Sequence, residues 1–160
     1  MNGMSKIVKT MTSVAFPLSL IFGLYVIAHG HLTPGGGFQG GAVVASGCVM
    51  ILIAYGSVWT MKKVKEKQLS ILESLGALGF IGLAFLGLIF GTVFFENILV
   101  GSKYPIFNEV PEFGSTLANI NTAGVLPLMN FAVGLKVIAG LFAIVLIMAY
   151  ATTKKYKEEV

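Results

Sequence analysis

The amino-acid sequence predicts an all-α integral membrane protein with four transmembrane helices and both termini in the cytoplasm. Two observations predict this fold class. Only 11% of the 160 residues are charged and 56% are hydrophobic, whereas about a quarter of a soluble domain is charged. The chain also has four stretches without Asp, Glu, Lys or Arg, namely residues 10–61, 74–95, 113–135 and 137–153. Because about 20 apolar residues let a helix cross a bilayer, this composition excludes a soluble globular protein.

The whole chain, residues 1–160, is predicted to form one membrane domain in the cell membrane. Pro17 is expected to kink the first helix or to mark a turn before it, because proline lacks the N–H that a helix interior needs. Pro127 falls in the first turn of the fourth helix, where the missing N–H is harmless. Hydropathy places the four helices at about 11–28, 38–60, 71–95 and 126–150, and leaves an outer loop at 96–125.

Lysine distribution predicts the orientation. Cytoplasmic loops of membrane proteins carry an excess of lysine and arginine. Nine of the 11 lysines fall in the two chain ends and in the connection between the second and third helices: Lys6, Lys9, Lys62, Lys63, Lys65, Lys67, Lys154, Lys155 and Lys157. The opposite side has Lys103 alone. The net charge of +4 is therefore interpreted as a topology signal beside a lipid bilayer, and no nucleic-acid partner is expected.

Two ionisable residues within the apolar stretches are candidates for an ion path. Lys136 lies ten residues into the fourth helix, about 15 Å deep at 1.5 Å per residue, where a charge costs at least ~3 kcal/mol. Glu73 lies near the start of the third helix, roughly 10 Å from Lys136 in depth if the helices are straight. A tight pair within the chain is therefore not expected. Lys136 either lines a proton or cation path or anchors a subunit interface. Glu73 either joins that path or is solvated at the membrane surface.

His29 and His31 flank Gly30 where the first helix is predicted to end. Histidine titrates near neutrality, so the pair could relay protons, or it could instead hydrogen-bond the backbone of the loop. Two histidines without a nearby carboxylate or cysteine make a poor metal site, so no metal is predicted. Residues 35–40 formally match G-x-G-x-x-G, but the region 10–61 contains no acid to bind a ribose, which excludes a dinucleotide cofactor. With no nucleophile–base arrangement either, a non-catalytic protein is predicted.

Residues 29–41, which read HGHLTPGGGFQGG, resemble the signature of the MnhB-like subunits of Mrp-type multisubunit sodium/proton antiporters. Four helices and a similar length extend the resemblance over essentially the whole chain. The resemblance implies an accessory subunit without catalysis of its own, in a complex that exchanges Na+ for H+. The matching motif residues are Gly30, His31, Pro34, Gly35, Gly36, Gly37, Phe38, Gly40 and Gly41.

Related subunits also occur in archaeal membrane-bound energy-converting hydrogenases and their sulfur-reducing relatives, where a redox arm is joined to an antiporter-like module. The MnhB-like subunits of stand-alone antiporters commonly have an acid entering the last helix, in a pattern like Phe-Asp-x-Gly-Val. Here Asn130 stands in the corresponding stretch and Lys136 follows it. This departure favours the module of a redox-driven complex over a stand-alone antiporter.

The resulting hypothesis is an accessory subunit that helps to form the ion path of a sodium/proton translocating complex, with the other membrane subunits as partners. The alternatives are the MnhB-like subunit of a stand-alone Mrp-type antiporter and a purely scaffolding subunit. Small residues at helical spacing predict close helix contacts, either within the chain or with a larger complex. They are Gly37, Gly41 and Ala45, Gly87 and Gly91, and Gly76, Gly79 and Gly82.

Overall fold

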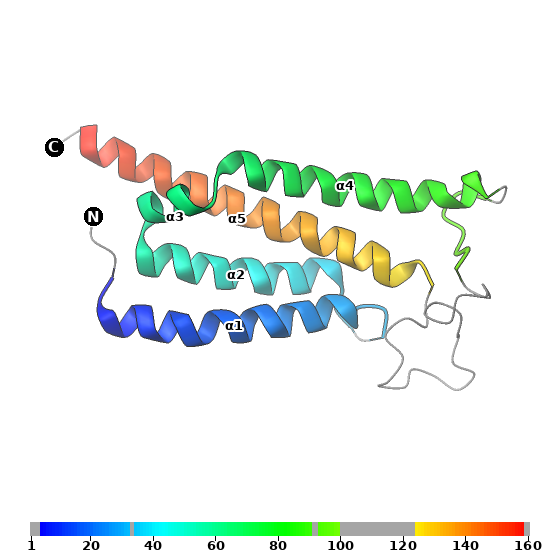
Figure 1. Cartoon of the computed structure of the whole chain (residues 1–160), viewed down its shortest axis with the longest axis horizontal. Helices are drawn as coiled ribbons and strands as arrows, with labels where there is room; N and C mark the ends of the chain where they lie inside the picture. The colour runs from blue at the N-terminus through cyan, green and yellow to red at the C-terminus, as the bar shows by residue number, and fades with distance from the viewer. Residues whose placement is uncertain (1–3, 33, 91–92, 100–123, 159–160) are drawn as a thin grey trace.

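The computed structural model of the chain describes residues 4–32, 34–90, 93–99 and 124–158. Four long helices and one short helix make up most of this part of the molecule (Figure 1). Most of the outer loop predicted at 96–125 lies outside the described residues. The helices are α1 (Lys6–Ala28), α2 (Gly37–Tyr55), α3 (Ser57–Lys63), α4 (Glu66–Ile89) and α5 (Leu126–Glu158).

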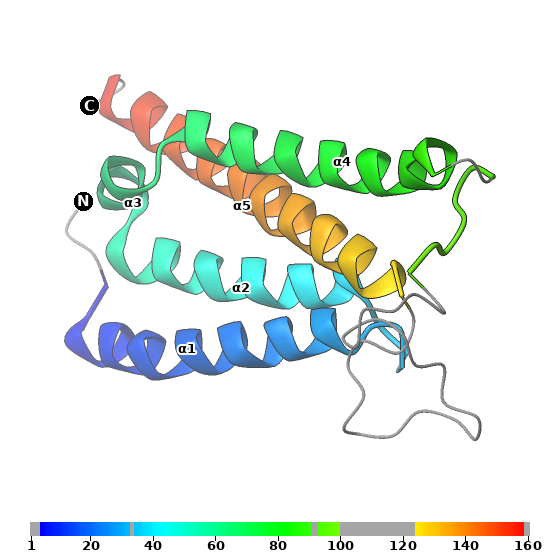
Figure 2. The same ribbon diagram turned by 45° about the vertical axis from the view of Figure 1, so that its right-hand side comes forward.

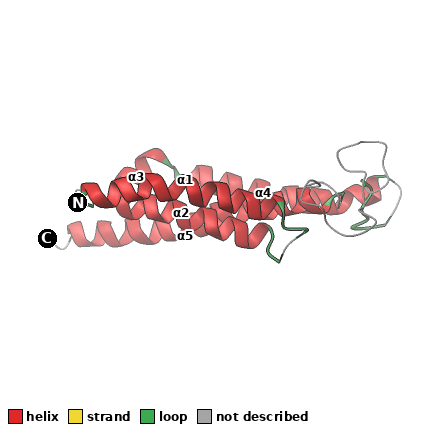
Figure 3. Ribbon diagram, turned by 90° about the horizontal axis from the view of Figure 1, so that it is seen from below, coloured by secondary structure: helices red, strands yellow, loops and turns green. Residues whose placement is uncertain are grey.

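The long helices lie side by side in the spatial order α1, α2, α5, α4 (Figures 1 and 2). Helix α2 packs between α1 and α5, and α4 packs chiefly against α5. The view in Figure 3 shows the narrow edge of this layer. Helix α1 begins and α5 ends at the end of the layer that carries α3 (Figure 1). Because α4 packs mainly against one helix, much of its surface is not covered by the rest of the described chain.

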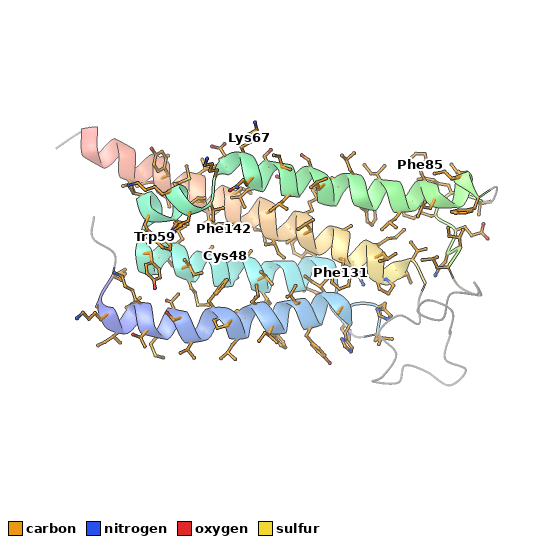
Figure 4. All side chains as sticks on the ribbon, viewed as in Figure 1. Cys48, Trp59, Lys67, Phe85, Phe131 and Phe142 are labelled. Atoms are coloured by element: carbon orange, nitrogen blue, oxygen red, sulfur yellow. The ribbon has the colours of Figure 1, made fainter. Side chains whose placement is uncertain are left out.

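Four helices are long and apolar enough to cross a membrane: Lys6–Ala28, Gly37–Tyr55, Glu66–Ile89 and Leu126–Thr153. Large apolar side chains also face outward over the length of the layer (Figure 4), including Ile7 at 76% exposed and Ile89 at 73%. Lipid or another membrane protein can cover such a surface, whereas exposure of so many apolar side chains to water is unfavourable. The predicted class, an all-α multi-pass membrane protein, is confirmed.

The helix predicted over 38–60 is interrupted. Helix α2 ends at Tyr55, and Gly56 has φ 87°, a conformation that L side chains rarely adopt. The short helix α3 follows, and its Ser57 hydroxyl lies 2.9 Å from the Thr153 hydroxyl of α5. The hydrogen bond between these hydroxyls ties α3 to the end of α5.

The other helix ends also differ from hydropathy. Helix α1 begins at Lys6 and continues through Pro17, so Pro17 does not mark a turn before the helix. The Ser5 hydroxyl accepts a hydrogen bond from the Val8 N–H and so caps the start of α1. Pro127 lies in the first turn of α5, as predicted, and is fully buried.

A cluster of four buried side chains joins α2, α4 and α5: Leu52, Leu69, Phe142 and Leu146. Cys48 packs against this cluster from α2 (Figure 4). Because all four members lie toward the α3 end of their helices, this apolar contact fixes α4 to α5 there. Toward the opposite end, close glycine contacts accompany other buried apolar side chains such as Ile27, Val44 and Ala139.

Candidate functional site

The connection between α1 and α2 contains the Pro-Gly-Gly-Gly motif. Helix α1 ends at Ala28, and the Leu32 N–H donates a hydrogen bond of 2.9 Å to the His29 carbonyl. Gly35 and Gly36 have φ of 146° and 145°. Because a side chain at either position would strain the backbone, only glycine fits this bend. The backbone conformation alone therefore explains why glycine stands at positions 35 and 36.

The first turns of α2 approach α5 so closely that no side chain fits between the helices. A Cβ atom at Gly37 would meet the Asn130 carbonyl oxygen and would lie 3.0 Å from the Gly134 nitrogen. A Cβ atom at Gly41 would lie 2.9 Å from the Val137 Cβ. The missing side chains therefore allow backbone-to-backbone packing of the kind that holds membrane helices together.

The same turns of α2 approach α1 on their other side. A Cβ atom at Gly40 would lie 2.6 Å from the Gly23 carbonyl oxygen and 2.8 Å from the Ile27 nitrogen. On α5, a Cβ atom at Gly134 would lie 2.7 Å from Ile27 Cδ1. We call this three-helix contact, made by Gly23, Gly37, Gly40, Gly41 and Gly134, the glycine crossing. For Gly37 and Gly41 the interpretation as packing within the chain is the one that the structure supports.

Asn130, which the resemblance predicts to replace an acid of stand-alone antiporter subunits, lies at the edge of the glycine crossing. A Cβ atom at Gly30 would lie 2.9 Å from Asn130 Nδ2, and one at Gly36 would lie 3.6 Å from Asn130 Oδ1. The Asn130 amide therefore faces the bend between α1 and α2. An acid at position 130 would therefore lie next to Gly30 and Gly36 of the glycine motif.

The two histidines lie at the same end of the layer. His29 is 7% exposed, and its ring stacks on Tyr25 with centroids 4.2 Å apart and an interplanar angle of 28°. His31 is half-buried in the turn after α1. Within the described residues, neither histidine belongs to a group of three or more residues that could hold a metal ion. Their role in a proton relay stays a prediction.

Glu73 and Lys136 lie on neighbouring helices, away from the histidines. A Cβ atom at Gly76 would lie 2.7 Å from the Lys136 nitrogen, and one at Gly140 would lie 3.5 Å from the Glu73 carboxylate. These contacts place Glu73 about one helical turn, ~5 Å, from the level of Lys136. The estimate of roughly 10 Å from straight helices is therefore too large. The Lys136 side chain is exposed on the surface of the chain, and no ion pair joins it to Glu73 in the described part of the molecule.

A groove of about 320 Å³ runs along α4 and α5 toward the α3 end. One wall carries Glu66, Ser70 and Glu73 of α4, and the other carries Gly140 and Ile144 of α5. We call this feature the α4–α5 groove. Lys136 lies one turn beyond Gly140 on the same face of α5. Glu73 therefore lines the groove, and Lys136 lies one turn beyond the residues that line it.

Sequence reasoning singled out Glu73 and Lys136 but missed the rest of the groove. Glu66, Ser70 and Glu73 recur at i, i+4 and i+7, which places them on one helix face. That signal was available in the sequence. The role of Gly140 was not, because it depends on which turn of α5 faces Glu73.

Four helices long and apolar enough to cross a membrane, with a glycine crossing at one end and a groove toward the other, define a small helical membrane protein. The family model described as a domain related to the MnhB subunit of the Na+/H+ antiporter matches residues 7–143. The chain belongs to this family, as the resemblance of residues 29–41 predicted.

Individual relatives agree with the family match. The chain is 38% identical over 147 residues to the uncharacterized protein MJ1307 of Methanocaldococcus jannaschii, a match that covers 88% of this chain and 52% of that protein. It is 28% identical over 106 residues to a putative antiporter subunit mnhB2 of Staphylococcus epidermidis, covering 65% of this chain and 73% of that subunit. The chain thus spans about half the length of the archaeal relative.

A solved structure shares the fold. A chain of the membrane-bound sulfane sulfur reductase, described as an archaeal respiratory membrane complex, superposes with a TM-score of 0.65 at 26% sequence identity. The superposition covers 92% of this chain and 61% of that chain. The arrangement of helices described above therefore occurs in a subunit of a larger membrane assembly.

Proposed function

We propose that the chain is an accessory, non-catalytic subunit of a multisubunit membrane complex that translocates sodium ions and protons. The observation that carries the proposal is the superposition of 92% of the chain on a subunit of an archaeal respiratory membrane complex. The family match to an antiporter subunit supports the ion chemistry. This combination favours the antiporter-like module of a membrane-bound hydrogenase or a sulfur-reducing complex.

Purification of the native assembly tests the proposal. The chromosomal copy is tagged, the membranes are solubilised gently, and co-purifying subunits are identified by mass spectrometry. Iron–sulfur or nickel–iron subunits together with antiporter-like subunits are expected. Recovery of antiporter subunits without a redox arm would favour the second candidate, the MnhB-like subunit of a stand-alone antiporter, which the relative in Staphylococcus epidermidis supports. A chain recovered alone from well-preserved membranes would contradict both.

The contribution of the chain to the ion path rests on Lys136. Its side chain is exposed on a helix that is long and apolar enough to cross the membrane, where a charge is costly and usually functional. Lys136→Met removes the charge and keeps the length, and Lys136→Arg keeps the charge. We expect Lys136→Met to lose sodium-dependent transport in an assembled complex and Lys136→Arg to retain part of it. Unchanged transport by an assembled Lys136→Met complex would favour a purely scaffolding subunit, and loss of assembly would indicate that Lys136 forms an ion pair at a subunit interface.

A further inference from the structure

Lys136 is exposed on a helix long and apolar enough to cross a membrane, so its surroundings must stabilise its positive charge. The side chain lies on the outer surface of the chain although its backbone packs against Gly76 of α4. Lys136 is ten residues from the start of α5, which is about 15 Å of helix. An ammonium group at that depth needs a carboxylate or a water-filled cavity beside it.

The described residues of the chain do not supply that carboxylate. The Glu73 carboxylate lies over Gly140, one turn from Lys136, and the two groups form no ion pair. Glu66 lies two further turns along α4, at the α3 end of the groove. No carboxylate of the described residues pairs with Lys136, which leaves a carboxylate of a neighbouring molecule or a water-filled cavity to stabilise its charge.

The α4–α5 groove of about 320 Å³ has room for side chains of a helix packed over it. On the α5 wall, Gly140 has no side chain and Ala143 has a small one. Small residues allow helix backbones to approach closely in a membrane. The α4 wall bears negative groups at Glu66 and Glu73, which disfavour the phosphate of an anionic lipid in the same place.

From these observations we infer that the α4–α5 groove receives a membrane-spanning helix of a neighbouring subunit, which places an aspartate or glutamate opposite Lys136. The inference rests on the proposed function, because a neighbouring subunit exists only in a complex. Charge complementarity selects the occupant: the partner helix carries its acid at the level of Lys136 and a hydrogen-bond donor or cation about one turn away, at the level of Glu73. Gly140 sets how closely that helix can approach.

Photo-cross-linking in the intact complex tests which molecule occupies the groove. A photoreactive phenylalanine analogue replaces Ile144, which lines the groove two turns from Lys136. After purification and illumination, the attached peptide is identified by mass spectrometry. We expect a membrane-spanning segment of another subunit with an Asp or Glu about eight residues from the attachment point. Attachment only to lipid, only to this chain, or to a segment without an acid would overturn the inference.

Two substitutions at Gly140 provide a matched test of the close approach. A Cβ atom at Gly140 would make ordinary contact with the Glu73 carboxylate, so Gly140→Ala fits the chain itself. Gly140→Leu fills the groove. We expect Gly140→Ala to co-purify with its partners at the wild-type level. For Gly140→Leu we expect at least a tenfold loss of co-purifying partners, with the amount of the chain in the membrane unchanged. A Gly140→Leu chain that assembles normally would contradict the inference.

The two proposals fail in different ways. If the wild-type chain purifies without other subunits, the proposed function is wrong. If it purifies with them but the probe at Ile144 attaches to lipid alone, only the helix in the groove is wrong. Should Gly140→Leu be absent from the membrane, the cross-linking result with the otherwise native chain decides.

Discussion

The glycine crossing and the α4–α5 groove are both lined by glycine, yet they are opposite kinds of contact. At Gly37 an added Cβ atom would meet the backbone of α5, including the Asn130 carbonyl oxygen. At Gly140 the nearest atoms would be those of the Glu73 carboxylate, 3.5 Å away, which is ordinary van der Waals contact. The first site is therefore closed within the chain, and the second is open to a partner.

This difference shows what glycine does in each place. In the glycine crossing it is needed for folding, because three helices share the space that side chains would fill. In the groove it leaves room that the described part of the chain does not use. The same residue type at helical spacing thus marks an internal contact in one region and a candidate docking surface in the other. Only the distances distinguish them.

Gly37→Ala is expected to have the largest effect on the chain, because the new methyl group cannot be placed without moving α2 away from α5. Overpacking costs about 1–3 kcal/mol and occasionally more, and here backbone atoms block the new methyl group. We expect most of the subunit to disappear from the membrane, and the complex that remains to dissociate at a lower temperature. Immunoblots of membranes and thermal melts of the purified complex measure both effects.

Gly79→Ala on α4 is the matched control for Gly37→Ala. A Cβ atom at Gly79 would lie 3.6 Å from the Ala132 Cβ, an ordinary contact with the same helix, α5. We expect the amount and the melting temperature to stay at the wild-type values. If both substitutions have equal effects, the distinction between closed and open glycine contacts is wrong.

Gly36→Ala is expected to have an intermediate effect, through the backbone rather than through packing. Gly36 has φ 145°, and an L residue held in a rarely populated conformation costs about 1–3 kcal/mol. The nearest atoms to an added Cβ are Asn130 Oδ1 at 3.6 Å and the Gly30 oxygen at 3.9 Å, so there is space for it. A moderate fall in the melting temperature of the complex is expected, with assembly retained. A fall as large as that of Gly37→Ala would show that the bend and the crossing act as one unit.

The sequence was sufficient for the fold class, because charge-free stretches long enough to cross a membrane are a strong signal. It did not reveal the break at Gly56. Residues 57–61 remain apolar or uncharged, so hydropathy continues through a position where one positive φ ends the helix. Hydropathy averaged over a long window of residues does not report the backbone angle at a single position.

The candidate site could be predicted only in part, for a similar reason. Glu73 and Lys136 stand out because charges are rare in apolar stretches. Their separation of about one turn depends on the register of α4 against α5, which Gly76 fixes by packing on the backbone of Lys136. Register is a tertiary property, so neither the depth difference nor the place of Gly140 in the groove follows from helix lengths.

Ser70→Ala is expected to have the smallest effect on the chain, and it tests the α4–α5 groove rather than the glycine crossing. Ser70 is exposed on the wall of the groove, and surface substitutions usually change stability by less than about 0.5 kcal/mol. The amount of subunit in the membrane should therefore equal that of wild type. If a partner helix occupies the groove, the same substitution changes the stability of the complex while leaving the amount of subunit unchanged. Melting temperatures of the purified complex, measured beside those of Gly79→Ala, separate the two effects, and a fall in subunit amount without any change in the complex would contradict an open groove.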